Sequence, residues 1–324
     1  MKYFLTGGTG FIGGALARKL RDHGHEVVAI ARNPEKAEGL RSLGVRVVRG
    51  DITDKESMRD AMQGCDGIFH VAGWYEIGKK DKSPGRKINV TGTRNVLELM
   101  HELGIPRGVY TSTVAINSDT KGALHDESYR HNGPYITEYE RTKAKAHRIA
   151  EDFIRDGLPL VIVMPGLVYG PEGTSNSDEA FRYYLRKKLP VMPKISAYNW
   201  SHVDDVVQAH LLAMEKASPG STYMITGPAH TLSEVFETAE KITGIRKPLA
   251  IPPFMLKVMA VFTGIVENLV PIPEMYAPEA LRAEAGVTYL GDNTKARKEL
   301  GYDPRPLEEG LRETLFYELE RMKS

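Results

Sequence analysis

The chain has 324 residues, 41% of them hydrophobic, and its 43 basic and 42 acidic side chains give a net charge of +1. This length allows one large domain or two closely packed ones, and the balanced charge predicts neither nucleic acid nor a membrane as a partner. A single cysteine, Cys65, excludes an intrachain disulfide and a cysteine-based zinc site. The first residues lead directly into a strand-like run without a signal-peptide pattern, so we expect a cytoplasmic protein.

Short apolar runs alternate with helical stretches through the first half of the chain. The expected strands are "KYFLT", "EVVAIA", "VRVVRG", "GIFHVA", "GVYTST" and "PLVIVMPG", and the expected helices begin near residues 11, 34, 55, 85 and 135. Strands that are apolar throughout and separated by helices imply a parallel sheet covered on both faces. The sequence therefore predicts an α/β fold with a doubly wound parallel-sheet Rossmann domain.

The alternation breaks after Pro165, where a loop rich in Gly, Ser and Asn is followed by a helix that we expect to end at Pro190. The apolar stretch "VMAVFTGIV" at 258–266 is too short to span a bilayer and predicts an amphipathic or buried helix. We expect a smaller, interleaved C-terminal substrate domain. The predicted division is 1–165 plus 200–226 for the dinucleotide-binding domain and 166–199 plus 227–324 for the substrate-binding domain.

Three glycines, Gly7, Gly10 and Gly13, lie between the first expected strand and the first helix. Glycines there let the backbone turn tightly and approach a diphosphate, which the N-terminus of the helix then binds. The strand before them and the helix after them favour a dinucleotide site over a simple glycine-rich turn.

The second strand ends in Ala31-Arg32-Asn33, without the acidic residue that usually binds the ribose 2′-hydroxyl of NAD. Arg32, together with Lys36, would suit the 2′-phosphate of NADP, because guanidinium forms bidentate hydrogen bonds with oxyanions. The sequence therefore predicts NADP rather than NAD. The alternative is a solvated arginine at a strand end.

Two further strand ends carry candidate contacts to the dinucleotide. Asp51, in "GDITD", lies where the adenine is expected, and could equally cap the helix that follows. Ala72 and Gly73 end the fourth strand and allow a ligand close to the carboxyl edge of the sheet. His70 beside them is expected to be a hydrogen-bonded core histidine.

The helix expected from about 135 to 156 places Tyr139 and Lys143 on the same face as Ala146, Ala150 and Phe153. This face is the apolar one, so both side chains point inward near the carboxyl edge of the sheet. The same spacing at Tyr75, Tyr183 and Tyr184 lacks this setting. The preceding strand ends in Thr111, Ser112 and Thr113, and it brings hydroxyl groups to the same place.

Taken together, these features resemble those of an extended short-chain dehydrogenase/reductase, similar to the dihydroflavonol-reductase-like branch and to hopanoid-associated sugar epimerases. The motifs that carry the resemblance extend nearly from end to end: "GGTGFIG", "GDITD", "FHVAG", "NVTGTRNVLE", "VYTSTVA", Tyr139 with Lys143, "MPGLVYGP", "HVDDVVQAHLLAMEK" and "YLGDNTKARKELGYDPRPLEEGL". They are specific for the superfamily and much less so for the substrate.

The resemblance implies hydride transfer to or from nicotinamide, with Tyr139 as the acid/base. Lys143 would bind the nicotinamide ribose and lower the pKa of Tyr139. Thr113, with Ser112 as the alternative, would polarise the carbonyl. Asn89 would organise a proton-relay water, or equally stabilise its helix by a hydrogen bond. The predicted dinucleotide site comprises Gly7, Thr9, Gly10, Phe11, Ile12, Gly13, Arg32, Lys36, Asp51, Ile52, Ala72, Gly73, Thr111, Tyr139, Lys143, Pro165, Gly166 and Val168.

Asp204 and Asp205 are adjacent carboxylates at the start of an expected helix, and we expect them to serve capping and packing rather than catalysis. The histidines show no metal-binding motif, so the sequence predicts no metal site.

The leading hypothesis is an NADP-dependent oxidoreductase that interconverts a small carbonyl compound and a secondary alcohol. The alternative is a nucleotide-sugar epimerase or dehydratase with tightly bound NAD(P), against which Gly166 stands where such enzymes tend to carry asparagine. A binding protein without turnover is a third class, disfavoured by the intact Tyr139 and Lys143. Pocket walls are expected from Trp74, Tyr75 and the segments 114–134 and 166–200. By analogy with the family, the two long helices from about 85 and 135 would pair in a homodimer.

Overall fold

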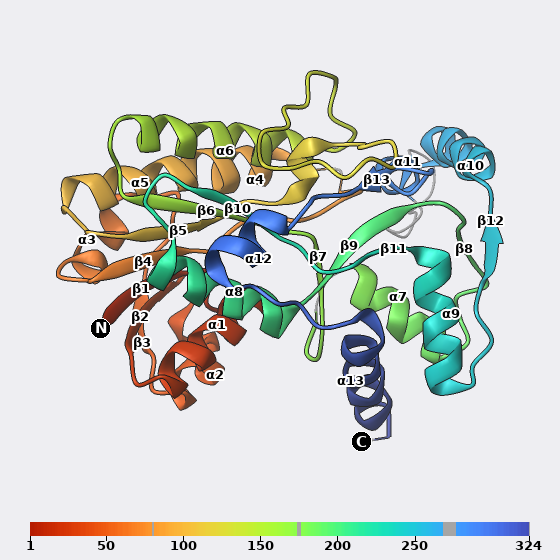
Figure 1. The fold of residues 1–324 in the computed structure, drawn as a ribbon, viewed down its shortest axis with the longest axis horizontal. Helices are drawn as coiled ribbons and strands as arrows, with labels where there is room; N and C mark the ends of the chain where they lie inside the picture. Colours follow the sequence, from red (N-terminus) through yellow and green to blue (C-terminus); the bar gives the residue numbers. More distant parts are fainter. Residues whose placement is uncertain (80, 174–175, 268–276, 324) are drawn as a thin grey trace.

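The computed structural model describes all residues except 80, 174–175, 268–276 and 324 (Figure 1). Within the described residues the larger sheet has seven parallel strands in the order β10-β6-β5-β4-β1-β2-β3. They are β1 (Lys2–Thr6), β2 (Glu26–Ala31), β3 (Arg46–Arg49), β4 (Gly67–His70), β5 (Gly108–Thr111), β6 (Leu160–Pro165) and β10 (Thr222–Ile225). The strand order reverses between β1 and β4. Open α/β sheets bind their ligands at the carboxyl ends of the strands beside such a reversal.

Helices cover both faces of this sheet, as predicted (Figure 1). One face is covered by α1 (Phe11–Asp22), α2 (Glu38–Ser42) and α8 (Val203–Lys216), and the other by α3 (Glu56–Met62), α5 (Thr93–Glu102) and α6 (Glu138–Arg155). The helix α1 buries Leu16, Ala17 and Leu20 at helical spacing, so its apolar stripe accounts for its place on the sheet. The predicted doubly wound parallel sheet is therefore confirmed.

The helix expected from about residue 85 is not continuous. It begins as α4 (Ser83–Gly85), widens into η2 (Arg86–Gly92), which is a π-helical turn, and continues as α5. Such turns are rare and often occur at functional sites. Here the turn contains Asn89, which is fully buried.

Four of the remaining strands form a second, smaller sheet. In it β11 (Ala229–Thr231), β9 (Ala197–His202) and β13 (Thr288–Tyr289) lie in this order, and β7 (Leu167–Tyr169) also pairs with β9. A separate pair is formed by β8 (Val191–Pro193) and β12 (Leu249–Ile251). The helices α7 (Asn176–Leu185), α9 (Leu232–Thr243) and α13 (Leu307–Arg321) pack beside this sheet around an aromatic core.

Two C-terminal helices differ in where they pack. The helix α11 (Pro278–Ala283) packs against α10 (Pro253–Val266), whereas α12 (Thr294–Leu300) packs on α8 and β10 of the larger sheet. The helix expected to end at Pro190 ends at Leu185, because Lys187 has a positive φ of 58° that turns the chain toward β8.

Candidate active site

The turn between β1 and α1 has glycine where a side chain would collide with the backbone. A Cβ atom at Gly13 would lie 2.1 Å from the carbonyl oxygen of Gly7, and one at Gly7 would lie 2.7 Å from the amide nitrogen of Ala72. Gly10 precedes the helix, so no capping side chain and no acidic residue competes for the N–H groups of its first turn. These features fit a bound diphosphate. The other predicted residues of the turn are Thr9, Phe11 and Ile12.

The predicted contacts to the 2′-phosphate lie just beyond β2. Arg32 follows the last residue of this strand, Lys36 lies in the short helix η1 (Pro34–Lys36), and both side chains are exposed. Within the described residues neither side chain forms an ion pair or hydrogen bond with a protein group. Their positive charges are therefore available to an external anion at this edge of the sheet.

Asp51 does not cap the helix that follows it. Its carboxylate accepts hydrogen bonds from the amide and the hydroxyl of Thr53, at 2.8 and 2.9 Å, and so closes a local turn. The helix α3 begins after Lys55 without a side-chain cap. Ile52 is buried, and the amide of Asn95 donates to its carbonyl oxygen.

The fourth strand ends beside this turn. His70 is fully buried between the hydroxyl groups of Thr6, at 2.8 Å, and Thr93, at 3.0 Å. Burial lowers the pKa of His70 to about 3, and the charge of Lys143 adds to this effect. His70 is thus a neutral, hydrogen-bonded core histidine, as predicted.

Lys143 is buried at the start of α6, with 5% of its surface exposed. Its ammonium group donates to the carbonyl oxygen of Thr111 at 2.8 Å and to the hydroxyl of Tyr110 at 3.2 Å. Burial without a carboxylate partner lowers the pKa of Lys143 to about 7. The lysine therefore lies at the carboxyl end of β5, where it was expected, and its partners are neutral.

Tyr139 lies one turn earlier on the same face of α6. Burial raises its pKa to about 12, and the hydrogen bond with Thr113 opposes that rise. The ring of Tyr75 meets the ring of Tyr139 edge-on, with centroids 4.8 Å apart. The pKa of Tyr139 is thus raised and not lowered as predicted, because burial of the phenol has the largest effect on it.

The hydroxyl groups after β5 point to different partners. Thr113 faces Tyr139, and it also accepts a hydrogen bond from the amide of Ala115 at 3.2 Å. The hydroxyl of Ser112 instead pairs with Nδ1 of His147 at 2.8 Å, in the interior. The structure thus brings Thr113, and not Ser112, together with Tyr139.

Thr111 has two contacts of its own in the same region. Its hydroxyl pairs with Nε2 of His210 at 2.8 Å, and its carbonyl oxygen accepts from Lys143.

Asn89 connects three segments of the site. Its side-chain oxygen accepts from the amide of Trp74 at 2.7 Å, while its side-chain nitrogen donates to the carbonyl of Trp74 and to the hydroxyl of Thr142. These hydrogen bonds join different elements and do not stabilise one helix internally. Gly73 lies beside this network, since a Cβ atom there would be 3.5 Å from the Asn89 oxygen and 3.9 Å from the ammonium of Lys143.

The segment after β6 passes close to the second sheet. Pro165 ends β6 and Val168 lies in β7. A Cβ atom at Gly166 would lie only 2.3 Å from the carbonyl oxygen of Asn199 in β9. This backbone therefore accepts no side chain at position 166.

Sequence reasoning missed three residues of this region. Tyr110 is the buried partner of Lys143. Glu279 accepts from the amides of Gly78 and Glu138, and so ties α11 to the start of α6. The carboxyl group of Glu284 is buried near Tyr198, and this burial raises its pKa to about 7. All three depend on contacts between distant segments, for which the sequence carries no local signal.

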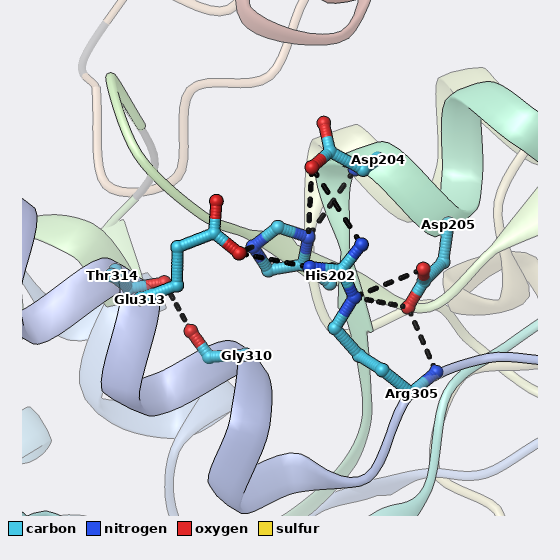
Figure 2. A network of polar contacts seen from close by, with 7 residues as sticks. All are labelled: His202, Asp204, Asp205, Arg305, Gly310, Glu313 and Thr314. Carbon is cyan, nitrogen blue, oxygen red and sulfur yellow. Dashed lines mark hydrogen bonds and ion pairs between the residues drawn. The ribbon is translucent and has the colours of Figure 1, made fainter.

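The predicted pair Asp204 and Asp205 lies in the first turn of α8, within a polar network around Arg305 (Figure 2). Asp205 accepts from the backbone amide of Arg305 and from its Nε, both at 3.0 Å. His202, Asp204 and Glu313 have potential metal ligands within 4.8 Å of one another. The guanidinium of Arg305 already pairs with both carboxylates of that group, at 3.6 and 2.9 Å, which favours a structural ion-pair network over a metal site.

Comparison with known proteins gives a consistent result. The model of the NAD dependent epimerase/dehydratase family matches residues 3–226. The chain is 31% identical to a Synechocystis protein named "Putative dihydroflavonol 4-reductase", over 97% of this chain and 94% of that one. It is also 31% identical to sterol demethylase protein B of Methylococcus capsulatus, over 94% of each chain.

Solved structures resemble the whole chain. The crystal structure of gox2253 has a TM-score of 0.85 and 27% identity, covering 98% of both chains. UDP-glucose 4-epimerase of Thermotoga maritima, solved with UDP-glucose, has a TM-score of 0.81 and 24% identity, covering 99% of this chain and all of the other. At that identity the second likeness shows the fold alone. Among the described residues, no helix combines the length and apolar character needed to cross a membrane.

Proposed function

This chain belongs to the NAD dependent epimerase/dehydratase family, and on that premise we propose that it is an NADP-dependent oxidoreductase interconverting a carbonyl compound and a secondary alcohol. It is an NAD(P)-dependent enzyme of the short-chain dehydrogenase/reductase type. The observation that carries the proposal is the meeting of Tyr139 and Thr113 beside the buried ammonium of Lys143. When bound, the dinucleotide supplies or accepts the hydride.

Tyr139 is assigned the proton transfer. With its pKa raised to about 12, the phenol is protonated at neutral pH and can donate to a carbonyl oxygen as that oxygen gains negative charge. Thr113 lies close enough to the phenol to lower its pKa, and its hydroxyl can donate to the same oxygen. The two groups therefore orient the carbonyl and stabilise the developing alkoxide.

Lys143 is assigned to the ribose next to the nicotinamide. An ammonium group has three donors, and two of them are used by Thr111 and Tyr110. The third can donate to a ribose hydroxyl. Because a bound hydroxyl adds an acceptor to a buried cation, we expect ligand binding to raise the pKa of Lys143 from its low value.

The glycine turn and the exposed cations support the choice of NADP. Glycine at positions 7 and 13 allows the tight backbone turn that leads into α1, and the uncapped N-terminus of α1 can bind a diphosphate. Arg32 and Lys36 carry the charge that a 2′-phosphate needs. On this basis residues 1–165 plus 200–226 hold the cofactor, and residues 166–199 plus 227–324, with Tyr75, shape the substrate pocket.

The nucleotide-sugar epimerase alternative is less well supported. Relatives include both classes, among them a 2-alkyl-3-oxoalkanoate reductase and a UDP-glucose 4-epimerase. Gly166 favours the reductase, because an asparagine at this position would collide with the carbonyl oxygen of Asn199. A small-molecule carbonyl or alcohol is therefore the proposed substrate.

The test follows the absorbance of the reduced cofactor while the purified protein is mixed with NADPH and a panel of ketones, aldehydes and nucleotide sugars. We expect oxidation of NADPH by at least one carbonyl compound. With that substrate, Tyr139→Phe should lower the rate by about 10²- to 10⁴-fold, the usual contribution of a general acid. Its affinity for NADPH should change little, since only one hydroxyl is lost.

Tyr317→Phe, on α13, is the matched control and should keep its activity. Activity of Tyr139→Phe above about a third of the wild-type rate would exclude Tyr139 as the acid, because the loss would fall far short of general-acid catalysis. Interconversion of sugar nucleotides without net consumption of NADPH would support the epimerase instead.

A further inference from the structure

The helix α10 carries a row of large apolar side chains on its outer face. Phe254, Val258, Val261, Phe262 and Ile265 are each between 64% and 67% exposed. Their spacing of four, seven, eight and eleven residues from Phe254 places them on one side of the helix. This is a continuous exposed surface, which we call the α10 face.

The inner side of α10 makes the contacts that attach this helix to the rest of the protein. Leu256 and Ala260 are buried, and they pack with Leu281 in α11 and with Ala285, which follows that helix. The core contact of α10 is thus already made. A contiguous exposed apolar surface of this kind marks an interaction site.

The surroundings extend this surface. Leu249 in β12 is 69% exposed, and Ile195, which follows β8, is 49% exposed. The amide of Lys194 donates to the carbonyl of Ile251, which places Ile195 beside the entry to α10. Figure 1 shows α10 and β12 at one end of the molecule and α3 at the opposite end.

The segment that leads into and forms α10 is basic, although Lys247 within it pairs with Glu237 of α9. Residues 241–266 contain four basic residues and no acidic one, and the first acidic residue beyond them is Glu267. Lys257 lies on α10 and is exposed, as is Lys194. An apolar face flanked by lysines is complementary to an anionic lipid surface, in which the apolar side chains enter the acyl boundary and the lysines meet the headgroups.

We propose that α10 docks in the plane of an anionic lipid membrane through the α10 face. The balanced charge of the whole chain predicts no membrane partner, but it does not show which side of this short apolar stretch is covered. A second copy of the chain fits less well, since pairing two α10 faces would bring the lysines of both copies together. The helix would lie on the membrane and would not span it.

The test is sedimentation of the purified protein with vesicles, in the absence of substrate, so its outcome does not depend on catalytic activity. One set of vesicles is pure phosphatidylcholine and the other contains phosphatidylglycerol as well. We expect wild type to bind the second set more strongly. Phe262→Ser should weaken that binding about ten-fold or more, which corresponds to losing the burial of one phenylalanine. Lys257→Glu should weaken binding about five-fold or more, and only to the anionic set.

Phe316→Ser is the matched control, because Phe316 is 44% exposed on α13, away from α10. It should bind vesicles as wild type does, and circular dichroism should show the same fold for all variants. Failure of wild type to bind anionic vesicles, or equal binding by Phe262→Ser, would overturn the proposal. A wild-type dimer in lipid-free light scattering that Phe262→Ser converts to a monomer would also overturn it, by assigning the α10 face to a second copy.

Discussion

The buried ammonium of Lys143 should leave a measurable signature in the pH dependence of stability. Its pKa is about 7 in the folded protein, against the ordinary value of 10.5 for a lysine in water. Between these two values the unfolded chain carries a proton that the folded chain has released. Stability therefore rises with pH across this range, because the unfolded state binds more protons. Below about pH 7 the full cost of burying the charge is present.

The size of the effect follows from the shift. Each pH unit between the two pKa values changes the free energy of unfolding by about 1.4 kcal/mol, with a smaller slope near pH 7 where the folded group is half protonated. From pH 7 to pH 9, Lys143 should thus add about 2 kcal/mol to the stability of wild type. Lys143→Met lacks the titrating group and should lack this increment.

The measurement is urea unfolding of wild type and Lys143→Met at pH 7, 8 and 9. The quantity to compare is the change of the free energy of unfolding with pH. The absolute stability of the variant is less informative, because relief of the buried charge is opposed by the loss of the donor to Thr111 and Tyr110. The neighbouring groups do not interfere, since the pKa of His70 is about 3 and that of Tyr139 about 12. Lys145→Met, at an exposed position on α6, is the matched control and should keep the wild-type slope.

Parallel stability curves for wild type and Lys143→Met would refute this reasoning. They would mean that Lys143 keeps its proton in the folded protein through its hydrogen bonds with Thr111 and Tyr110.

Three further predictions concern the proposed reaction and its cofactor. Thr113→Ala should lower the rate with folding preserved, whereas Ser112→Ala should affect the rate less and stability more, because Ser112 pairs with buried His147; the reverse order of rates would move the polarising role to Ser112. Arg32→Asp should weaken NADPH binding about ten- to a hundred-fold and favour NADH, which fluorescence titration of both cofactors checks, and an unchanged preference would make Arg32 a solvated residue. Asn89→Ala should lower both stability and rate, as it removes hydrogen bonds to Trp74 and Thr142, whereas an unaltered melting temperature would contradict this structural role.

The parts of the site that the sequence predicted are those whose signals are local. The glycines of the first turn are required by close approaches within a few residues or to the adjacent strand, and their spacing shows this directly. The inward position of Tyr139 and Lys143 follows from the apolar periodicity of α6. The alternation of strands and helices likewise predicted the parallel sheet.

The parts that the sequence did not predict depend on contacts across the fold. The π-helical turn at Asn89 is held by hydrogen bonds to Trp74 and Thr142, on two other segments. The raised pKa of Tyr139 comes from burial by neighbouring segments, and no motif records it. Gly166 was used in the sequence analysis as an indicator of substrate class. The structure shows a second reason for this glycine, which is the close approach of β9.

The helix α10 shows most clearly why composition leaves function open. A run of nine apolar residues between charged ones is compatible with a buried helix and with a helix that presents these residues to a partner. The two cases differ only in what covers Val258, Val261 and Phe262, which depends on the tertiary position of the helix. In this fold Leu256 and Ala260 make the buried contacts of α10, so Val258, Val261 and Phe262 remain exposed. Since exposing apolar surface to water is unfavourable, any surface that covers the α10 face lowers the free energy of the protein. The exposed Lys257 and Lys194 beside this face favour an anionic surface.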